Sequence, residues 1–194
     1  MIHFITWLLI PVLTFLVSGP YDWFTLNFSV IGSEFPQNLL LLGWAMVVGG
    51  FYHTFTRYCI GQTAPYLHAK TELAMIDGAV CLLLTAILFP YKPSSLPFIS
   101  MLHLAMAFSA SVIFFLSITI VDLKLLVIAP RLFFLPTVLL LFAILVSIGL
   151  LALCNFLITS ALEIFLTIFS CFWLKLFHRR IIILVRKKRM AARI

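Results

Sequence analysis

Long apolar runs separated by short polar stretches make up most of the chain. Six such segments can be read, at about residues 2–19, 38–58, 71–89, 97–120, 132–153 and 156–177. Each is close to the roughly 20 residues that a helix needs to cross a bilayer. None shows the alternation of apolar and polar residues that is typical of membrane strands. The pattern therefore predicts an all-α integral membrane protein, folded as a six-transmembrane-helix bundle.

One connection between segments is unusually short, and two stretches allow a second interpretation. The last two segments are separated only by residues 154–155, which predicts a tight helical hairpin. Residues 125–153 can instead be read as one tilted or kinked span, because Pro130 and Pro136 lie near its start. The first segment ends in Val17-Ser18-Gly19, as a signal peptide can. The segment begins with almost no basic n-region, and further spans follow, so a membrane span is favoured over a cleaved signal peptide.

Composition agrees with a membrane location. The 194 residues are 64% hydrophobic and 10% charged, with a mean hydropathy of +1.21, whereas an ordinary soluble domain is about 25% charged. A soluble fold of this size could not bury so much apolar surface. We therefore expect a single bundle over residues 1–178 and a basic cytoplasmic tail over residues 179–194.

The basic residues predict an orientation. The net charge of +7 would suggest a nucleic-acid partner in a soluble protein, but here the excess lies near the C-terminus. If the N- and C-termini are both cytoplasmic, only Lys92 of the 13 Lys and Arg residues falls on the outer side. This bias follows the positive-inside rule. It indicates a multi-pass protein of the plasma membrane that does not bind nucleic acid.

Ionisable side chains within apolar spans are costly and mark candidate functional sites. An inner polar layer contains His53, Arg57, Glu72 and Asp77. His53 and Arg57 are four residues apart and share one helix face, and Asp77 lies roughly 9 Å into the membrane at 1.5 Å per residue. Pairing of His53 or Arg57 with either carboxylate would lower the cost of burial. The layer is either an ion pair that locks two helices or a proton or ion relay.

An outer polar layer contains His103 and Glu163, which lie at similar depths in the fourth and sixth segments. If these helices touch, the two side chains could share a proton or bind a polar or cationic headgroup. A helix–helix hydrogen bond is the structural alternative. The long outer loop, residues 20–37, is predicted to lie on the membrane surface, where three of its residues could cover the site: Asn27, Ser29 and Glu34.

The C-terminal basic cluster is a candidate contact for anionic lipid of the inner leaflet. A basic residue near such a surface contributes about 1 kcal/mol. A topology anchor without a specific ligand is the alternative interpretation. The residues are Arg179, Arg180, Arg186, Lys187, Lys188 and Arg189.

Metal and cofactor chemistry has little support. The chain has no HExxH or CxxCH motif, and His53 and His103 fall on opposite sides of the predicted bilayer, so we expect neither a metal nor a cofactor. The four cysteines form no CxxC pair and are read as small buried residues. No Ser–His–Asp spacing, glycine-rich phosphate loop or pair of carboxylates on one helix indicates a catalytic centre.

Two short motifs resemble a known family. The stretch Asn27-Phe28-Ser29-Val30-Ile31-Gly32, and the pattern of Phe89-Pro90 followed by His103 and Ala107, resemble uncharacterised bacterial six-helix membrane proteins of the broader DRAM/Sfk-like family. The resemblance covers about residues 20–120. It implies a non-enzymatic polytopic protein linked to lipid organisation or stress responses, with residues 27–32 and His103 as family positions.

Three functions fit these observations. The first is a non-enzymatic bundle in lipid handling, in a membrane-stress response or as an accessory subunit, with membrane lipids, other membrane subunits or a second copy as partners. The second is a small proton- or ion-coupled transporter, whose polar path would join the two layers through His53, Asp77, His103 and Glu163. The third is a membrane-embedded lipid-acting enzyme with His103 as base, which predicts a lipid-accessible pocket at that residue.

Overall fold

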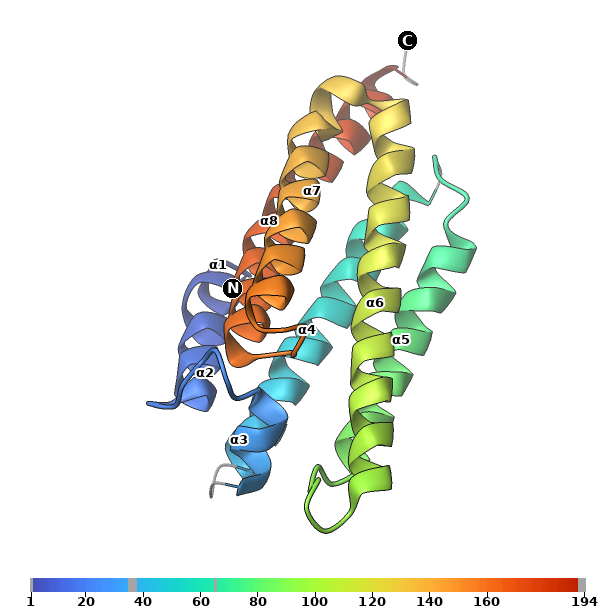
Figure 1. Ribbon diagram of the computed structural model, residues 1–194. Coiled ribbons are helices and arrows are strands. Elements are labelled where there is room, and N and C mark those ends of the chain that lie inside the picture. The colour runs from blue at the N-terminus through green and yellow to red at the C-terminus, as the bar shows by residue number, and fades with distance from the viewer. Residues whose placement is uncertain (1, 35–37, 65, 192–194) are drawn as a thin grey trace.

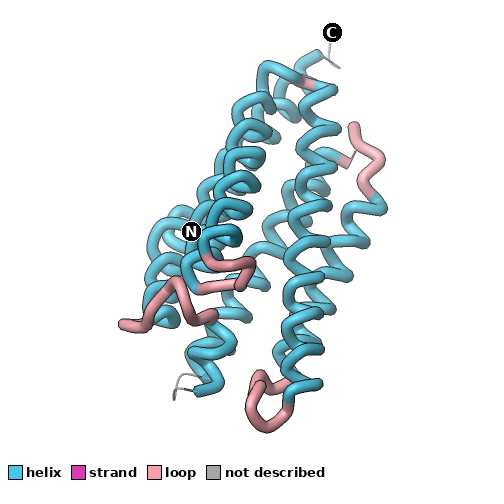
Figure 2. The backbone as a smooth tube through the Cα atoms, viewed as in Figure 1, coloured by secondary structure: helices cyan, strands magenta, loops and turns pink. Residues whose placement is uncertain are grey.

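The computed structural model describes residues 2–34, 38–64 and 66–191. Within these ranges the regular elements are all helices and no strand occurs, so the predicted all-α class is confirmed. Figure 1 shows long helices that run side by side, and Figure 2 marks in pink the short loops that join their ends. Among the described residues, five helices are long and apolar enough to cross a membrane. A helical membrane protein is confirmed, whereas the sixth predicted span is not.

The N-terminal segment accounts for the difference in span number. Three helical pieces follow one another there: α1 (Ile2–Phe4), η1 (Ile5–Leu9) and α2 (Ile10–Ser18). The apolar stretch Ile5–Ser18 falls in the class of shorter apolar helices. The π-helical piece η1 precedes Pro11, whose ring crowds the carbonyl four residues earlier and which has no N–H to donate. The Ile10 N–H accordingly bonds to the Ile5 carbonyl, one residue further back than in an α-helix.

The predicted surface loop contains a helix. α3 (Phe28–Glu34) contacts α4 (Asn38–Thr63). A Cβ atom at Gly32 would lie 2.3 Å from Leu41 Cδ2, so the absence of a side chain permits the close approach of the two helices. This hairpin holds Ser29 against the bundle instead of on the membrane surface.

Four further helices complete the bundle: α5 (Lys70–Leu88), α6 (Pro97–Ile128), α7 (Pro130–Leu153) and α8 (Ser160–Ala191). Each of these four helices contacts the next one along the chain, and α8 also contacts α2 and α4. α6 and α7 are separated at Ala129, whose φ of −143° and ψ of 70° are not helical. A following proline disfavours helical geometry at the residue before it. The alternative of one span over residues 125–153 is therefore wrong.

The predicted hairpin of the last two segments is present, because α7 contacts α8, but its connection is longer than the predicted two residues. The turn between α7 and α8 spans residues 154–159, and Asn155 and Phe156 within it adopt positive φ values of 54° and 60°. α8 then continues through residue 178 into the segment predicted as a tail. Its 32 residues extend about 48 Å at 1.5 Å per residue, which exceeds the roughly 30 Å hydrocarbon core of a bilayer.

The two ends of the bundle differ in charge. At one end, called the basic end, α4, α6 and α8 finish and α5 and α7 begin, and it carries Lys70, Lys124, Arg131 and the C-terminal basic residues of α8. The other end, called the loop end, carries the loops over residues 19–27, 89–96 and 154–159. Lys92 is the one Lys or Arg in those three loops.

The main hydrophobic core lies toward the basic end, where α6, α7 and α8 pack together. It contains the largest fully buried side chains of these helices: Leu125, Phe133, Trp173, Leu174, Phe177 and Ile181. A smaller cluster at the loop end joins α2, α3 and α8: Val17, Phe28, Ile31 and Ile164. The space between this smaller cluster and the α5–α6 pair is filled less completely, and the candidate site lies there.

Candidate functional site: a cavity at the loop end

His103 of α6 connects three helices at the loop end. Its Nε2 lies 3.0 Å from Ser29 Oγ of α3. Its Nδ1 lies 2.8 Å from the Ala86 carbonyl and 2.9 Å from the Phe89 carbonyl, at the end of α5. Carbonyl oxygens only accept hydrogen bonds, so Nδ1 carries the hydrogen. In the neutral ring, Nε2 then has a free lone pair and accepts the Ser29 hydroxyl.

Glu163 of α8 faces the same helix, α3, from the other side. Its Oε2 accepts the Phe28 N–H at 2.7 Å, and Asn27 Oδ1 accepts the Val30 N–H at 2.8 Å. Both bonds satisfy free N–H groups of the first helical turn. The start of α8 is fixed to the loop that precedes α3, because the Ser160 N–H donates to the Leu26 carbonyl at 2.7 Å.

The structure brings most of the predicted outer layer together. Ser29, His103 and Glu163 all line one cavity, although His103 and Glu163 bond to successive residues of α3 and not to each other. Asn27 caps α3 next to the cavity. The side chain of Glu34, the remaining member of the predicted layer, lies outside the described residues.

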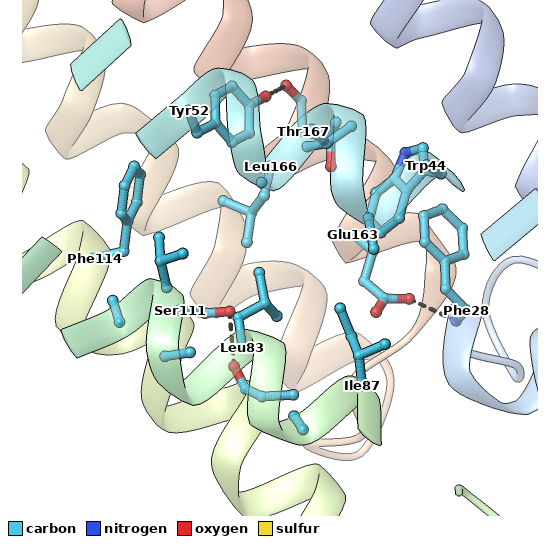
Figure 3. Close-up of a pocket in the computed structure, with 18 of the residues that line it drawn as sticks. Phe28, Trp44, Tyr52, Leu83, Ile87, Ser111, Phe114, Glu163, Leu166 and Thr167 are labelled. Carbon is cyan, nitrogen blue, oxygen red and sulfur yellow. Dashed lines mark hydrogen bonds between the residues drawn. The ribbon is translucent and has the colours of Figure 1, made fainter. Parts of the chain in front are cut away.

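The cavity has a volume of about 260 Å³ and is partly open at its edge. Its walls come from α3, α4, α5, α6 and α8 and are mainly apolar, with Leu83 and Ile87 on one side and Trp44 and Leu166 on the other. Figure 3 shows the Glu163 carboxyl group between Phe28 and Ile87. The cavity therefore combines apolar walls with polar groups gathered near the loop end.

Tyr52 and Phe114 lie at the end of the cavity away from Glu163 (Figure 3). The Tyr52 hydroxyl donates to the Thr167 carbonyl and lies 3.3 Å from Cys171 Sγ. These contacts tie α4 to α8, and the aromatic rings mark where the cavity gives way to the main core. Tyr52 was missed by sequence reasoning, which did not count tyrosine among the candidate polar residues of the spans.

The predicted inner layer divides into two ion-paired groups. Asp77 of α5 receives both predicted partners from α4: His53 Nε2 lies 2.9 Å from its Oδ1, and Arg57 bonds to its Oδ2. Glu72 instead pairs with Lys124 of α6, with 2.6 Å between Oε1 and Nζ. The first group joins α4 to α5 and the second joins α5 to α6, and none of these five residues lines the cavity.

Asp122 of α6 is a buried acid that sequence reasoning missed, because it lies beyond the predicted end of the fourth segment at residue 120. It is fully buried, and its Oδ2 lies 2.6 Å from Thr137 Oγ1, which is also 2.9 Å from the Phe133 carbonyl. The Thr137 hydroxyl has one hydrogen and can donate fully to one of these acceptors only. Asp122 Oδ1 has no hydrogen-bond partner among the described residues.

We expect Asp122→Asn to leave the free energy of unfolding within about 0.5 kcal/mol of the native protein. The amide has the same shape and can still bond to Thr137, and no basic partner for Asp122 is present among the described residues. Thermal unfolding in mild detergent measures the change. A loss of about 2 kcal/mol or more would show that the charge of Asp122 is itself stabilising.

The candidate lipid-contact residues lie on the last turns of α8. Lys188 Nζ lies 5.9 Å from the centroid of the Tyr66 ring, a weak cation–π contact. The side chain of Arg189 lies outside the described residues. The described part of the chain contains no group of three His, Cys, Asp or Glu side chains that could hold a metal ion.

The fold and the site together define a helical, multi-pass membrane protein with an apolar cavity at one end. No family model, curated protein or solved structure matches the chain. The resemblance to the DRAM/Sfk-like family stays a prediction.

Proposed function

We propose that the protein takes one acyl chain of a membrane lipid, or another single-chain amphiphile, into the cavity, with the polar group of the ligand at Glu163 and His103. The observation that carries this proposal is the cavity of about 260 Å³, with apolar walls and polar groups gathered at one end. Such a lining is typical of small-molecule sites, and the cavity volume lies just below the range of about 300–1,000 Å³ that such sites have. The size favours one acyl chain over a complete two-chain lipid.

Lipid handling is favoured over ion-coupled transport by the position of the charged groups. A carrier needs polar groups that continue from one side of the membrane to the other. His53, Arg57 and Asp77 do not line the cavity. The rings of Tyr52 and Phe114 lie at the end of the cavity away from Glu163. The ion pairs at the basic end have the simpler role of joining helices.

We further propose that the basic end, with the C-terminus, is cytoplasmic and contacts anionic lipid of the plasma membrane, and that residues 2–18 cross as a shorter sixth span, which places the N-terminus on the same side. The separation of Lys92 from the remaining described Lys and Arg residues supports this orientation. α8 is about 48 Å long, so its last turns extend past the hydrocarbon core into the headgroup region. There, Arg179, Arg186 and Lys187 can approach lipid phosphates.

Ala107→Phe is expected to lower the affinity for a single-chain lysophospholipid at least about tenfold, which corresponds to about 1.4 kcal/mol. Ala107 lines the cavity, so a phenyl ring there would occupy the space proposed for the acyl chain. Native mass spectrometry of the full chain, released from mild detergent, measures the bound fraction over a series of lysophospholipid concentrations.

Ala105→Phe provides the matched control. Ala105 lies two residues away on α6, is exposed and does not line the cavity, so its substitution should leave binding unchanged. Equal binding to the native protein and both variants would contradict the proposed location. Absence of saturable binding to the native protein would contradict the function itself.

A further inference from the structure

Ser29 and His103 form a hydrogen-bonded pair on the wall of the cavity, with 3.0 Å between Ser29 Oγ and His103 Nε2. We propose that this pair hydrolyses an ester bond of the bound amphiphile, with Ser29 as nucleophile and His103 as general base. The inference rests on the proposed binding of an acyl chain in the cavity. It adds a reaction and a substrate class, the acyl ester, to that binding.

The orientation of His103 suits a general base. The carbonyls of Ala86 and Phe89 hold the Nδ1 hydrogen at 2.8 and 2.9 Å, which directs the Nε2 lone pair toward Ser29. A nucleophile within hydrogen-bond reach of a base, which is itself held by a third group, is the arrangement that activates serine in acyl transfer. Here two main-chain carbonyls take the place of a carboxylate as the orienting group.

Ser29 differs from the other helical serines near it. Ser33 Oγ donates to the Val30 carbonyl at 3.1 Å, and Ser111 Oγ donates to the Ala107 carbonyl at 3.0 Å. Both hydroxyls therefore bond within their own helix, as helical serines commonly do. The Ser29 hydroxyl instead crosses from α3 to α6 and meets the histidine ring.

Other contacts hold α3 in place without the Ser29–His103 hydrogen bond, which argues against a purely structural role for this pair. Glu163 holds the Phe28 N–H at 2.7 Å, and Asn27 caps the helix at the Val30 N–H. The close contact of Gly32 with Leu41 fixes α3 against α4. Glu163 acts here as a positioning residue, since its bond to the neighbouring residue sets where Ser29 lies.

The reaction balances with water as the second reactant. Ser29 Oγ attacks the ester carbonyl carbon, and its proton passes to His103 Nε2. The bond from that carbon to the alcohol oxygen then breaks, and Nε2 returns the proton to the departing alcohol, which leaves an acyl group on Ser29. Water attacks this acyl group, gives a proton to Nε2, and releases the fatty acid while the proton returns to Ser29 Oγ.

An alkyl fluorophosphonate tests the nucleophile directly. Attack by Ser29 Oγ on phosphorus releases fluoride and leaves a phosphonyl group on the protein, which intact-mass analysis of the full chain in mild detergent detects. We expect one phosphonyl group per native chain, located at Ser29 by peptide mass spectrometry. Ser29→Ala should abolish this labelling, while Ser33→Ala, in the same helix but outside the cavity lining, should label at the native rate.

His103→Gln tests the base. The amide can still bond to Ser29 but is not a base, so labelling should slow by at least about 100-fold. A merely structural role predicts an unchanged rate for any His103 variant that folds. The melting temperature of each variant is measured in the same detergent to establish that it folds.

The outcomes separate this inference from the proposed function. Lysophospholipid binding by a native chain that is not labelled would overturn the hydrolytic pair and leave the binding proposal intact. Labelling of native protein at a residue other than Ser29 would also overturn the pair, and this readout needs no variant. Absence of saturable lysophospholipid binding would instead overturn the proposed function.

Discussion

Replacing Trp173 with alanine is expected to lower the free energy of unfolding by about 3–5 kcal/mol. Trp173 is 2% exposed and lies where α7 and α8 pack together. Its ring stacks on Phe177 with 4.6 Å between centroids, and its Nε1 donates to the Pro136 carbonyl at 2.8 Å. The alanine variant loses the packing of a large aromatic side chain, the stacking contact and an interhelical hydrogen bond in one step.

Trp173→Phe separates these contributions. A phenyl ring keeps much of the packing but leaves the Pro136 carbonyl without its indole donor, so we expect a loss of about 1–2 kcal/mol. Trp7→Ala is the matched control, because Trp7 is 58% exposed and its removal should cost under about 1 kcal/mol. Thermal or denaturant unfolding in mild detergent, followed by circular dichroism, measures all three. Equal losses for Trp7→Ala and Trp173→Ala would contradict the assignment of the main core.

The helical class could be predicted because lipid requires each span to satisfy its own backbone hydrogen bonds. Long apolar runs therefore mark helices directly. Helix ends were less predictable, since α6 and α8 continue well past their apolar runs. In both, charged residues follow on the same helix: Lys124 pairs with Glu72 of α5, and Lys188 contacts Tyr66. Such tertiary contacts support a helix beyond its predicted apolar run and cannot be read from hydropathy.

The sequence was enough to predict which residues share a layer of the candidate site. It was not enough to predict which of them form hydrogen bonds with each other. Depth along a helix follows from rise per residue, so His103 and Glu163 could be assigned to one layer. Their partners depend on α3, a short helix inside a segment predicted as a surface loop. Gly32 allows that helix to pack on α4, and only then does Ser29 meet His103. A glycine with this role cannot be distinguished by sequence from one in a loop.

The two halves of the bundle are built in different ways, which accounts for the position of the cavity. Toward the basic end, large side chains such as Phe133 and Trp173 fill the space between α7 and α8. Toward the loop end, small residues such as Gly49, Ala79 and Ala107 face the cavity instead. Small residues ordinarily allow helices to approach closely in membranes. Here they leave space that the proposed acyl chain would occupy.

Lys124→Met is expected to lower the free energy of unfolding by about 2 kcal/mol. Glu72 is 4% exposed, and Lys124 Nζ lies 2.6 Å from its Oε1 and 3.1 Å from the His68 carbonyl. Methionine keeps most of the side-chain length but removes the positive charge, so Glu72 is left buried without its basic partner. The expected loss stays below the 3–5 kcal/mol typical of a broken buried pair, because the Lys124 side chain is 39% exposed.

A double-mutant cycle with Glu72→Gln identifies the cause of this loss. If the unpaired charge is responsible, Glu72→Gln combined with Lys124→Met should be more stable than Lys124→Met alone by about 1 kcal/mol or more. Unfolding of the four proteins in one detergent measures the coupling. Additive losses would mean that Lys124 stabilises the bundle through the His68 carbonyl alone. A coupled result would show that the Lys124–Glu72 pair joins α5 to α6 at the basic end. The same two helices line the cavity further along, so the pair would also help to set their relative position there.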